Sequence, residues 1–251
     1  MVANQFVSKY DPKLVQQAVD RLFALLRMDE KIDPSWRVCI KPNLLMKRRP
    51  EEGTTTHPAV VRAVIRHLQA LGVENITIAD SPGGVYTKAA LTGIYQASGM
   101  EEVAKETGAA LNFDLGTTHC PQPEGVMCRA FDLINPVAQA DFVISIAKLK
   151  SHCMTGLSGG VKNLFGCIPG LTKPEFHWRY PKEDDFCNML LDLCQTVKPG
   201  LTFVDAIVSM EGDGPSSGDL RETGLLLAAD DPYQLDMVLS HVIGREPETI
   251  A

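Results

Sequence analysis

A glycine-rich stretch flanked by lysines is the part of this sequence best suited to chemistry. Residues 148–163 read KLKSHCMTGLSGGVKN, so Lys148 and Lys150 precede the glycines and Lys162 follows them. Glycines let the backbone approach a ligand closely, and successive amides in such a turn can bind an anion. Lysines favour the same guest, such as a phosphate, a carboxylate or an anionic cofactor. The stretch matches neither the P-loop pattern nor G-x-G-x-x-G, and a simple loop joining a strand to a helix is the alternative.

Two histidines flank the same turn. His152 lies before the glycines, and His177 lies beyond a Pro-Gly pair. Imidazole suits both proton transfer near neutral pH and metal ligation, although a lone histidine is often structural. We assign catalysis to His152, Lys150 and Asp80, with His152 as the general acid or base, and we name His152 and His177 as candidate metal ligands.

Polar side chains also follow several buried apolar runs. Lys41 and Asn43 come after VCI, Asp80 comes after NITIA, and Asp205 lies within LTFVDAIV. Ligands collect at the carboxyl ends of strands in open α/β sheets, so we expect one shared site. Solvated loops, or a surface lysine at position 41, would explain any one of these clusters. The predicted ligand-binding residues are Lys41, Asn43, Lys148, Ser158, Gly159, Gly160, Lys162, Asn163 and Asp205.

Buried strands and amphipathic helices must position these side chains. Short apolar runs without alternation are typical of strands covered on both faces, and they occur at 37–40, 75–80, 141–147, 201–208 and 224–229. Helical periodicity predicts helices at 58–72, 88–107 with a break near 98–99, 184–197 and 231–244. This alternation predicts an α/β fold, with a layered, mainly parallel sheet and helices on both faces, in a single domain over residues 1–251. Residues 116–133 predict a loop or hairpin excursion.

The composition argues against several function classes. A formal net charge of −7 over 251 residues argues against a nucleic-acid partner, which normally needs a basic face. No apolar run reaches the roughly 18 residues that span a bilayer, and the N-terminus lacks signal-peptide features. Seven cysteines without any C-x-x-C pair indicate neither a disulfide framework nor a complete zinc or iron–sulfur motif. We therefore expect a cytoplasmic protein with no nucleic-acid or membrane partner.

Four stretches, which contain KPNLL, THPAVVRAVIRHLQALGVENITIADSPGG, DFVISIAKLKSHCMTGLSGGVKNLFGCIPG and AADDPYQLDMVLSHVIG, resemble the family known as domain of unknown function 362. The resemblance runs from about Val38 to Gly244. Members often continue into a ferredoxin-like module with two four-iron, four-sulfur clusters, whose cysteines this chain lacks. The sequence stops at Ala251, one turn into a helix predicted from Pro247 and Glu248, so we expect a truncation before such a module.

A second, local resemblance covers fewer than thirty residues. The layout of SHCMTGLSGGVKNLFGCIPGLTKPEFH is similar to the region of nickel-pincer lactate racemase that holds its nicotinate-derived cofactor. The resemblance implies that His152, Lys162 and His177 match the two histidines and the tethering lysine of that region. The other substrate-binding cations and the acid–base histidines of a racemase have no counterparts that we can place.

Three functions remain open at this point. The first is an enzyme domain that binds a small anionic substrate or cofactor at the Lys/His site and works in a redox or iron–sulfur-linked system, with a ferredoxin-like module or electron-transfer partner. The second is a metal- or pincer-cofactor-dependent isomerase or racemase, in which a nickel-type cofactor is held. The third is a non-catalytic scaffold that docks a partner or assists cofactor assembly. The resident cofactor and the oligomeric state are left open.

Overall fold

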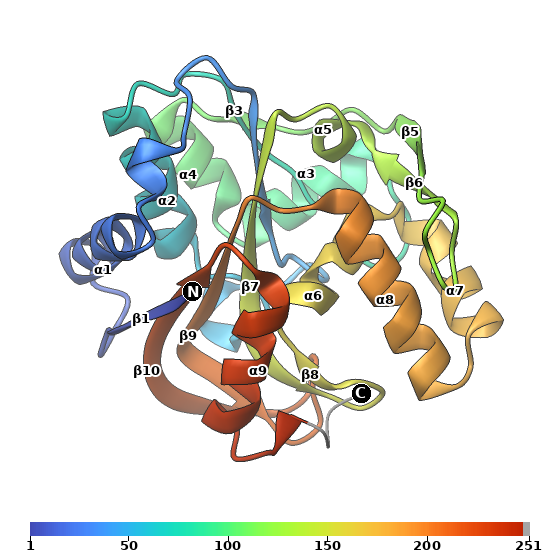
Figure 1. Cartoon of the computed structure of the whole chain (residues 1–251). Coiled ribbons are helices and arrows are strands. Elements are labelled where there is room, and N and C mark those ends of the chain that lie inside the picture. Colours follow the sequence, from blue (N-terminus) through green and yellow to red (C-terminus); the bar gives the residue numbers. More distant parts are fainter. Residues whose placement is uncertain (248–251) are drawn as a thin grey trace.

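The main sheet has eight strands, and seven of them follow the order β1-β10-β9-β7-β2-β3-β4, with β8 added to β7 (Figure 1). The computed structural model describes residues 1–247. Strands β9, β7, β2, β3 and β4 run parallel, whereas β10 and β1 complete one edge in antiparallel pairing. The strand bounds are β1 (Val2–Phe6), β2 (Val38–Pro42), β3 (Ile76–Ile78), β4 (Ala110–Leu111), β7 (Phe142–His152), β8 (Gly156–Ser158), β9 (Leu201–Glu211) and β10 (Asp219–Ala229). The predicted α/β fold with a mainly parallel sheet is confirmed.

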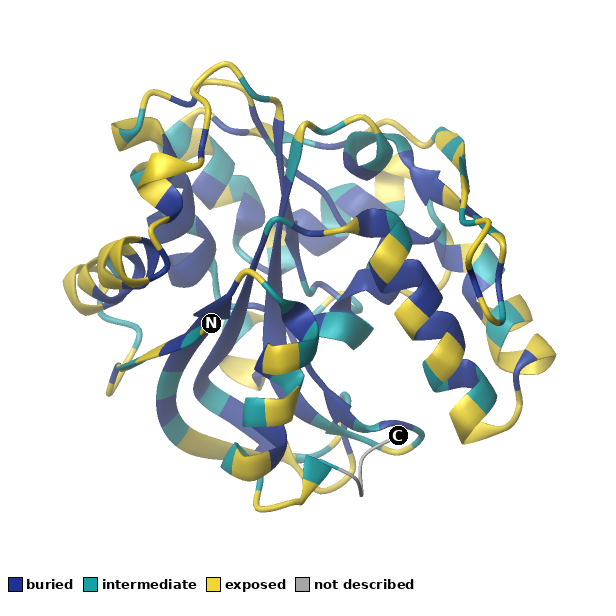
Figure 2. Ribbon diagram, in the orientation of Figure 1, coloured by how far each residue is buried: buried dark blue, intermediate teal, exposed yellow. Residues whose placement is uncertain are grey.

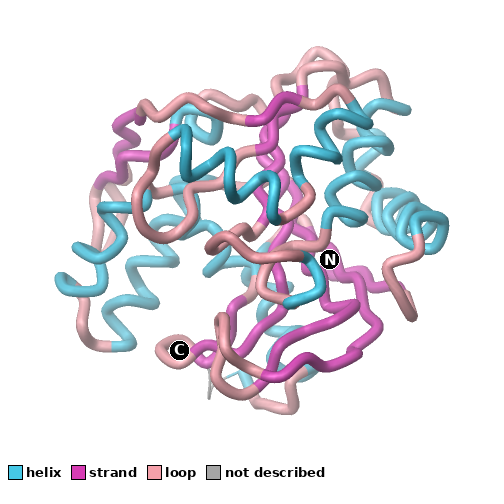
Figure 3. The backbone as a smooth tube through the Cα atoms, turned by 180° about the vertical axis from the view of Figure 1, so that it is seen from behind, coloured by secondary structure: helices cyan, strands magenta, loops and turns pink. Residues whose placement is uncertain are grey.

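Helices cover both faces of this sheet, as the front and back views show (Figures 1 and 3). Their bounds are α1 (Pro12–Leu25), α2 (Pro58–Ala70), α3 (Lys88–Ala97), α4 (Met100–Thr107), α5 (Asn135–Ala138), α6 (Gly160–Asn163), α7 (Lys173–Arg179), α8 (Glu183–Val197) and α9 (Pro232–Val242). Short 3-10 helices lie at Met28–Glu30, Pro50–Glu52, Leu164–Cys167 and Gly170–Thr172. A separate hairpin pairs β5 (Thr117–Pro121) with β6 (Ala130–Ile134), as predicted for 116–133.

Local sequence explains where several helices begin and end. Asp11 accepts hydrogen bonds from the amides of Lys13 and Leu14 and so caps α1. Pro58 occupies the first turn of α2, where its missing N–H costs nothing. Gly99 adopts φ 77° between α3 and α4, which confirms the predicted break in the helical segment.

Alternate residues of the central strands pack on opposite faces. Val38 and Ile40 of β2 join the core under α1 and α2, whereas Cys39 between them joins the core under α8. On β7, Ile146 faces the first core and Ala147 faces a third cluster under α9. Both faces are therefore buried (Figure 2), which is why these strands are continuously apolar in sequence.

The chain leaves the two central strands in opposite directions. From β2 it continues through α2 to β3, and from β7 it continues through α8 to β9. Because α2 and α8 belong to the cores on opposite faces, a topological switch point lies between β2 and β7. In open α/β sheets, ligands bind outside the carboxyl ends of strands at such a point.

Two elements near the N-terminus were not predicted from the sequence. Strand β1 and helix α1 were not assigned from the sequence, although Asp11 followed by Pro12 is a helix-start signal. The helix predicted from Pro247 and Glu248 falls largely outside the described residues. Within residues 1–247, no helix has both the length and the apolar character needed to cross a membrane.

The packing of the core predicts that two aromatic substitutions change the free energy of unfolding by very different amounts. Phe203 on β9 is fully buried and its ring lies 5.6 Å from that of Phe23, whereas Trp178 on α7 is 86% exposed. We expect Phe203→Ala to lower the free energy of unfolding by about 3–5 kcal/mol, because it leaves a cavity. Trp178→Ala should change it by less than about 0.5 kcal/mol. Urea unfolding of both variants tests this, and equal losses would contradict the packing described here.

Candidate functional site

A cavity of about 290 Å³ lies at the switch point. Its wall takes side chains from the ends of β2 and β7, from the loop after β3, and from α6 and α7. Nine of the residues predicted from sequence line it: Lys41, Asn43, Asp80, Lys150, His152, Ser158, Lys162, Asn163 and His177. The expectation of one shared site at several strand ends therefore agrees with the geometry.

An ion pair forms the floor of the cavity. Lys41 Nζ lies 2.7 Å from Asp80 Oδ1, and both side chains are almost fully buried. Lys41 also donates to Asn163 Oδ1 at 3.0 Å, while the Leu44 amide donates to Asp80 Oδ2 at 2.8 Å. Gly166 must be glycine, because a Cβ there would collide with both charged groups. Asp80 is thus held in place by the protein and serves to position Lys41.

Among residues 1–247, no carboxylate forms an ion pair with Lys150. Its ammonium donates to Asn43 Oδ1 at 2.9 Å and to the Thr54 carbonyl at 2.7 Å, and the residue is 1% exposed. Burial first, and the charges of Lys148 and Lys162 in addition, lower the pKa of Lys150 to about 7. A lysine with this pKa exchanges its proton near neutral pH.

Two more lysines complete the cationic wall. The Lys162 ammonium lies 5.3 Å from the Phe165 ring centroid and 5.2 Å from that of Phe186, and burial lowers its pKa to about 8. Lys173 donates to the carbonyls of Ser81 and Pro82, and burial lowers its pKa also to about 8. Among the residues that line the cavity, four lysines face a single carboxylate.

The two histidines of the cavity are uncharged at neutral pH. His152 Nδ1 accepts hydrogen bonds from the amides of Met154 and Thr155 at 3.1 and 3.3 Å, so the ring proton sits on Nε2. Burial, assisted by the Lys162 charge, lowers the pKa of His152 to about 3. His177 stacks on Phe186 at 4.5 Å between ring centroids, and burial lowers its pKa. In this tautomer His152 Nε2 carries a proton that it can donate, while Nδ1 is occupied by the two amides.

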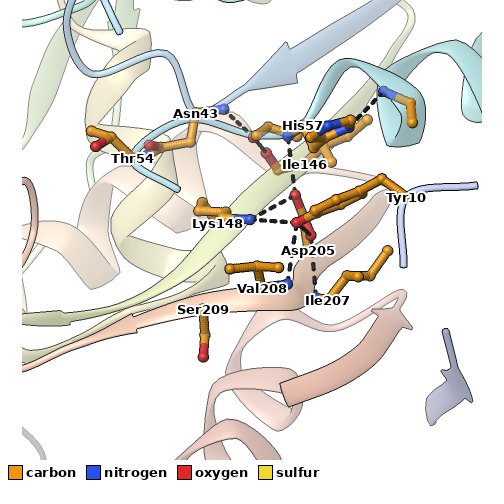
Figure 4. A network of polar contacts seen from close by, with 12 residues as sticks. Tyr10, Asn43, Thr54, His57, Ile146, Lys148, Asp205, Ile207, Val208 and Ser209 are labelled. Carbon is orange, nitrogen blue, oxygen red and sulfur yellow. Dashed lines mark hydrogen bonds and ion pairs between the residues drawn. The ribbon is translucent and has the colours of Figure 1, made fainter. Parts of the chain in front are cut away.

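Lys148 and Asp205 lie outside the cavity, in a separate buried network (Figure 4). Lys148 Nζ lies 3.1 Å from Asp205 Oδ2 and donates to the Tyr10 hydroxyl at 2.7 Å. The Tyr10 hydroxyl donates to Asp205 Oδ1 at 2.8 Å, and the His57 amide donates to Oδ2 at 3.0 Å. The Tyr10 and His57 rings stack with centroids 3.6 Å apart. Every charge in this network has an internal partner, so the network holds β7, β9 and the start of α2 together.

The predicted anion-binding turn is occupied by the protein itself. The amides of Gly160 and Val161 donate to the two carboxylate oxygens of Asp236, at 2.6 and 2.9 Å. Burial raises the pKa of Asp236 to about 6. A Cβ at Gly159 would collide with the same carboxylate, which explains the glycine. Gly159 and Gly160 therefore hold α6 against α9, and their amides are occupied by Asp236.

Lys173 was not predicted from the sequence, and Ser81 was given no role. The Ser81 hydroxyl is buried, lines the cavity and has no hydrogen-bond partner among the described residues. Lys173 is the first residue of α7 and stands immediately before Pro174. A proline in the first turn is a helix-start signal, and it could have indicated that the backbone fixes the position of Lys173. Within residues 1–247, no three His, Cys, Asp or Glu side chains are grouped as a metal site would require.

The two kinds of buried lysine predict different stability effects. Lys148→Met leaves Asp205 as an unpaired buried charge, which we expect to cost about 3–5 kcal/mol of unfolding free energy. Among residues 1–247, Lys162 makes no hydrogen bond or ion pair, so Lys162→Met should be neutral or stabilising. Denaturant unfolding at neutral pH measures both, and a large loss for Lys162→Met would show that this lysine is structural.

One solved structure shares this fold, and a second was matched below a TM-score of 0.5. The lactate racemase apoprotein from Thermoanaerobacterium thermosaccharolyticum superposes with a TM-score of 0.53 at 11% identity, over 92% of this chain and 55% of that one. This chain thus spans about half the length of that protein. A Thermotoga maritima protein superposes with a TM-score of 0.49 at 13% identity, over 82% of this chain and 52% of that one. At such identities the likeness concerns the fold alone.

Sequence comparison identifies the family. The Thylakoid-associated protein sll1697 of Synechocystis sp. is 34% identical over 224 residues, which are 89% of this chain and 68% of that protein. The family model described as Domain of unknown function (DUF362) matches residues 38–241, from the first central strand to the last described helix. This range contains every residue that lines the cavity. The chain therefore belongs to the DUF362 family.

Proposed function

We propose that this protein is an enzyme domain whose lysine-rich cavity binds a small anionic substrate or cofactor. The observation that carries the proposal is the imbalance of charge, four lysines against the single carboxylate of Asp80. Two of these lysines, Lys41 and Lys150, are 1% exposed, so their charges are enclosed rather than spread over a surface. A bound carboxylate or phosphate would restore the balance where water cannot screen it. The cavity volume of about 290 Å³ suits a small ligand.

We assign the proton-transfer role to Lys150. A group with a pKa of about 7 is best suited to act as both base and acid near neutral pH. Its contacts with Asn43 and the Thr54 carbonyl aim the amine toward the cavity. His152 would donate a hydrogen bond from Nε2 to the ligand, and Lys41 would bind its negative charge. This division changes the roles expected from sequence, where His152 was the acid or base.

The pH dependence of anion binding tests this assignment. Lys150 loses its charge in the free protein as pH rises through about 7, and Lys162 and Lys173 follow near 8. Affinity for oxalate should therefore be greatest below about pH 7. It should fall above that pH by up to about tenfold per pH unit for each lysine that must regain its proton. Calorimetric titrations between about pH 6 and pH 9 would measure this slope.

Matched lysine variants provide the control for that titration. Lys150→Met should weaken oxalate binding and flatten the slope near pH 7, whereas Lys13→Met, on the exposed side of α1, should change neither. Undiminished binding by Lys150→Met, or failure of oxalate, phosphate and other small anions to bind the wild type, would overturn the proposal.

The alternative of a partner-docking scaffold has less support. A docking surface for an acidic partner would present its lysines to solvent, whereas three cavity lysines form buried hydrogen bonds to the chain itself.

We extend the proposal to a redox or iron–sulfur-linked system on the family resemblance alone. Sequencing the gene beyond the codon for Ala251 tests it, because cysteines in ferredoxin spacing would support it. A cytoplasmic location, consistent with seven free cysteines, is tested by cell fractionation.

A second candidate is a metal- or pincer-cofactor-dependent isomerase. The observation that favours it is that His152, Lys162 and His177, which match the racemase layout, line the same cavity. The residues fit such a group in part, because Lys162 makes no ion pair among residues 1–247, and the protonated Nε2 of His152 can donate a hydrogen bond to the cofactor rather than bind its metal. Lys162 would tether the cofactor, His152 and His177 would hold it, and a nickel-type cofactor would supply the metal chemistry there.

Protein purified from its native host tests this second candidate. We expect a covalent mass addition on the peptide that contains Lys162, together with bound nickel, and neither in Lys162→Met. Intact-mass spectrometry and elemental analysis give the two readouts. A wild-type protein with no added mass and no nickel would end this candidate and leave the anion-binding proposal in place.

A further inference from the structure

A second cavity, of about 250 Å³, lies beside the first. It is bounded by α8, α9 and the segment from β8 to α6. In Figure 1, α6 lies between β7 and α8. Most of the lining side chains are apolar or aromatic: Leu157, Val161, Leu190, Leu191, Tyr233, Met237 and Pro247.

The two cavities meet at Lys162, which lines both. On β8, Ser158 lines the first cavity and its neighbour Leu157 lines the second. On α6, Asn163 lines the first and Val161 lines the second. A thin wall formed by β8 and α6 therefore separates a cationic space from an apolar one. No hydrogen bond or ion pair with residues 1–247 fixes the Lys162 ammonium, so its long side chain can yield to a ligand.

The second cavity offers almost no charge to a ligand. Asp236 is its single acidic residue among the described residues, and that carboxylate already accepts from the amides of Gly160 and Val161. The other titratable side chains there are Lys162, Cys187 and Tyr233. For Cys187 and Tyr233, burial raises the pKa of the thiol and of the phenol, so both stay neutral at physiological pH. An uncharged chain suits this space better than a second anionic group.

We propose that the ligand is amphipathic, with an anionic head in the first cavity and a short apolar chain in the second. The head would lie among Lys41, Lys150 and Lys173, and the chain would pass Lys162 and lie between the side chains of α8 and α9. This inference rests on the proposed function, because it takes the first cavity as an anion site. It adds the class of ligand, a carboxylate or phosphate ester that carries several methylene groups.

A series of straight-chain carboxylates tests the inference on the full chain. Acetate, butyrate, hexanoate and octanoate share one head group and differ only in chain length. Once the chain enters the second cavity, each buried methylene should tighten binding about fourfold, which corresponds to about 0.8 kcal/mol. Isothermal titration calorimetry at one pH below 7 measures the four affinities.

Filling variants locate the chain. Met237 and Leu191 line the second cavity and are 57% and 39% exposed, so a larger side chain there can be accommodated. We expect Met237→Trp and Leu191→Trp to leave acetate binding unchanged and to abolish the gain with chain length. Leu14→Trp, at a 39% exposed position on α1 outside both cavities, is the matched control and should keep the gain.

The outcomes separate this inference from the proposed function. Binding of acetate and phosphate with no gain from butyrate to octanoate would overturn the inference and leave the anion site standing. A gain that survives in both filling variants, or octanoate binding that is unaffected by Lys150→Met, would also overturn it. If no anion of any length binds, the proposed function fails, and this inference fails with it.

Discussion

Several lysine ammonium groups are buried beside a single carboxylate, and the rest of the site depends on this constraint. Ammonium groups cost several kcal/mol each when they leave water, and they repel one another in a medium of low dielectric constant. Asp80 offsets one of them, and Lys150 and Lys173 instead point at the carbonyl oxygens of Thr54, Ser81 and Pro82. These dipoles satisfy the donors but leave the net charge in place. The lowered lysine pKa values express that residual cost, and an anion is the group that would relieve it.

Strand β7 carries two lysines, and only one of them has a carboxylate partner inside the protein. Lys148 and Lys150 are two residues apart on β7, so the strand period directs both to one side. The pairing with β9 joins Lys148 to Asp205 but Lys150 to Met210, because the register shifts between them. Lys148 therefore meets a carboxylate and is neutralised inside the protein. Lys150 lies where β9 has departed from regular pairing, and its charge is left to the cavity.

Small residues allow the charged groups to come together. Gly166 carries the backbone past the Lys41–Asp80 pair, and its carbonyl accepts from the Ser81 amide at 2.9 Å. Gly159 and Gly160 let α6 approach Asp236 on α9, and α6 in turn carries Lys162 and Asn163 to the boundary of the two cavities. The glycines of this region thus support the side chains that form the site, rather than binding the ligand directly.

Sequence alone determined the layered α/β fold, because doubly buried strands and amphipathic helices leave unmistakable apolar patterns. It also indicated nine of the residues that line the cavity, since Lys41, Asp80 and Lys150 all follow or end such strands and the carboxyl ends of parallel strands meet at one edge. Only the tertiary structure separated Lys148 and Asp205 from the cavity, because that depends on a register shift between strands. It alone added Lys173, whose partners Ser81 and Pro82 are distant in sequence, and assigned the glycine turn to Asp236. These outcomes depend on contacts between side chains that are far apart in sequence. A local pattern of residues does not indicate such contacts.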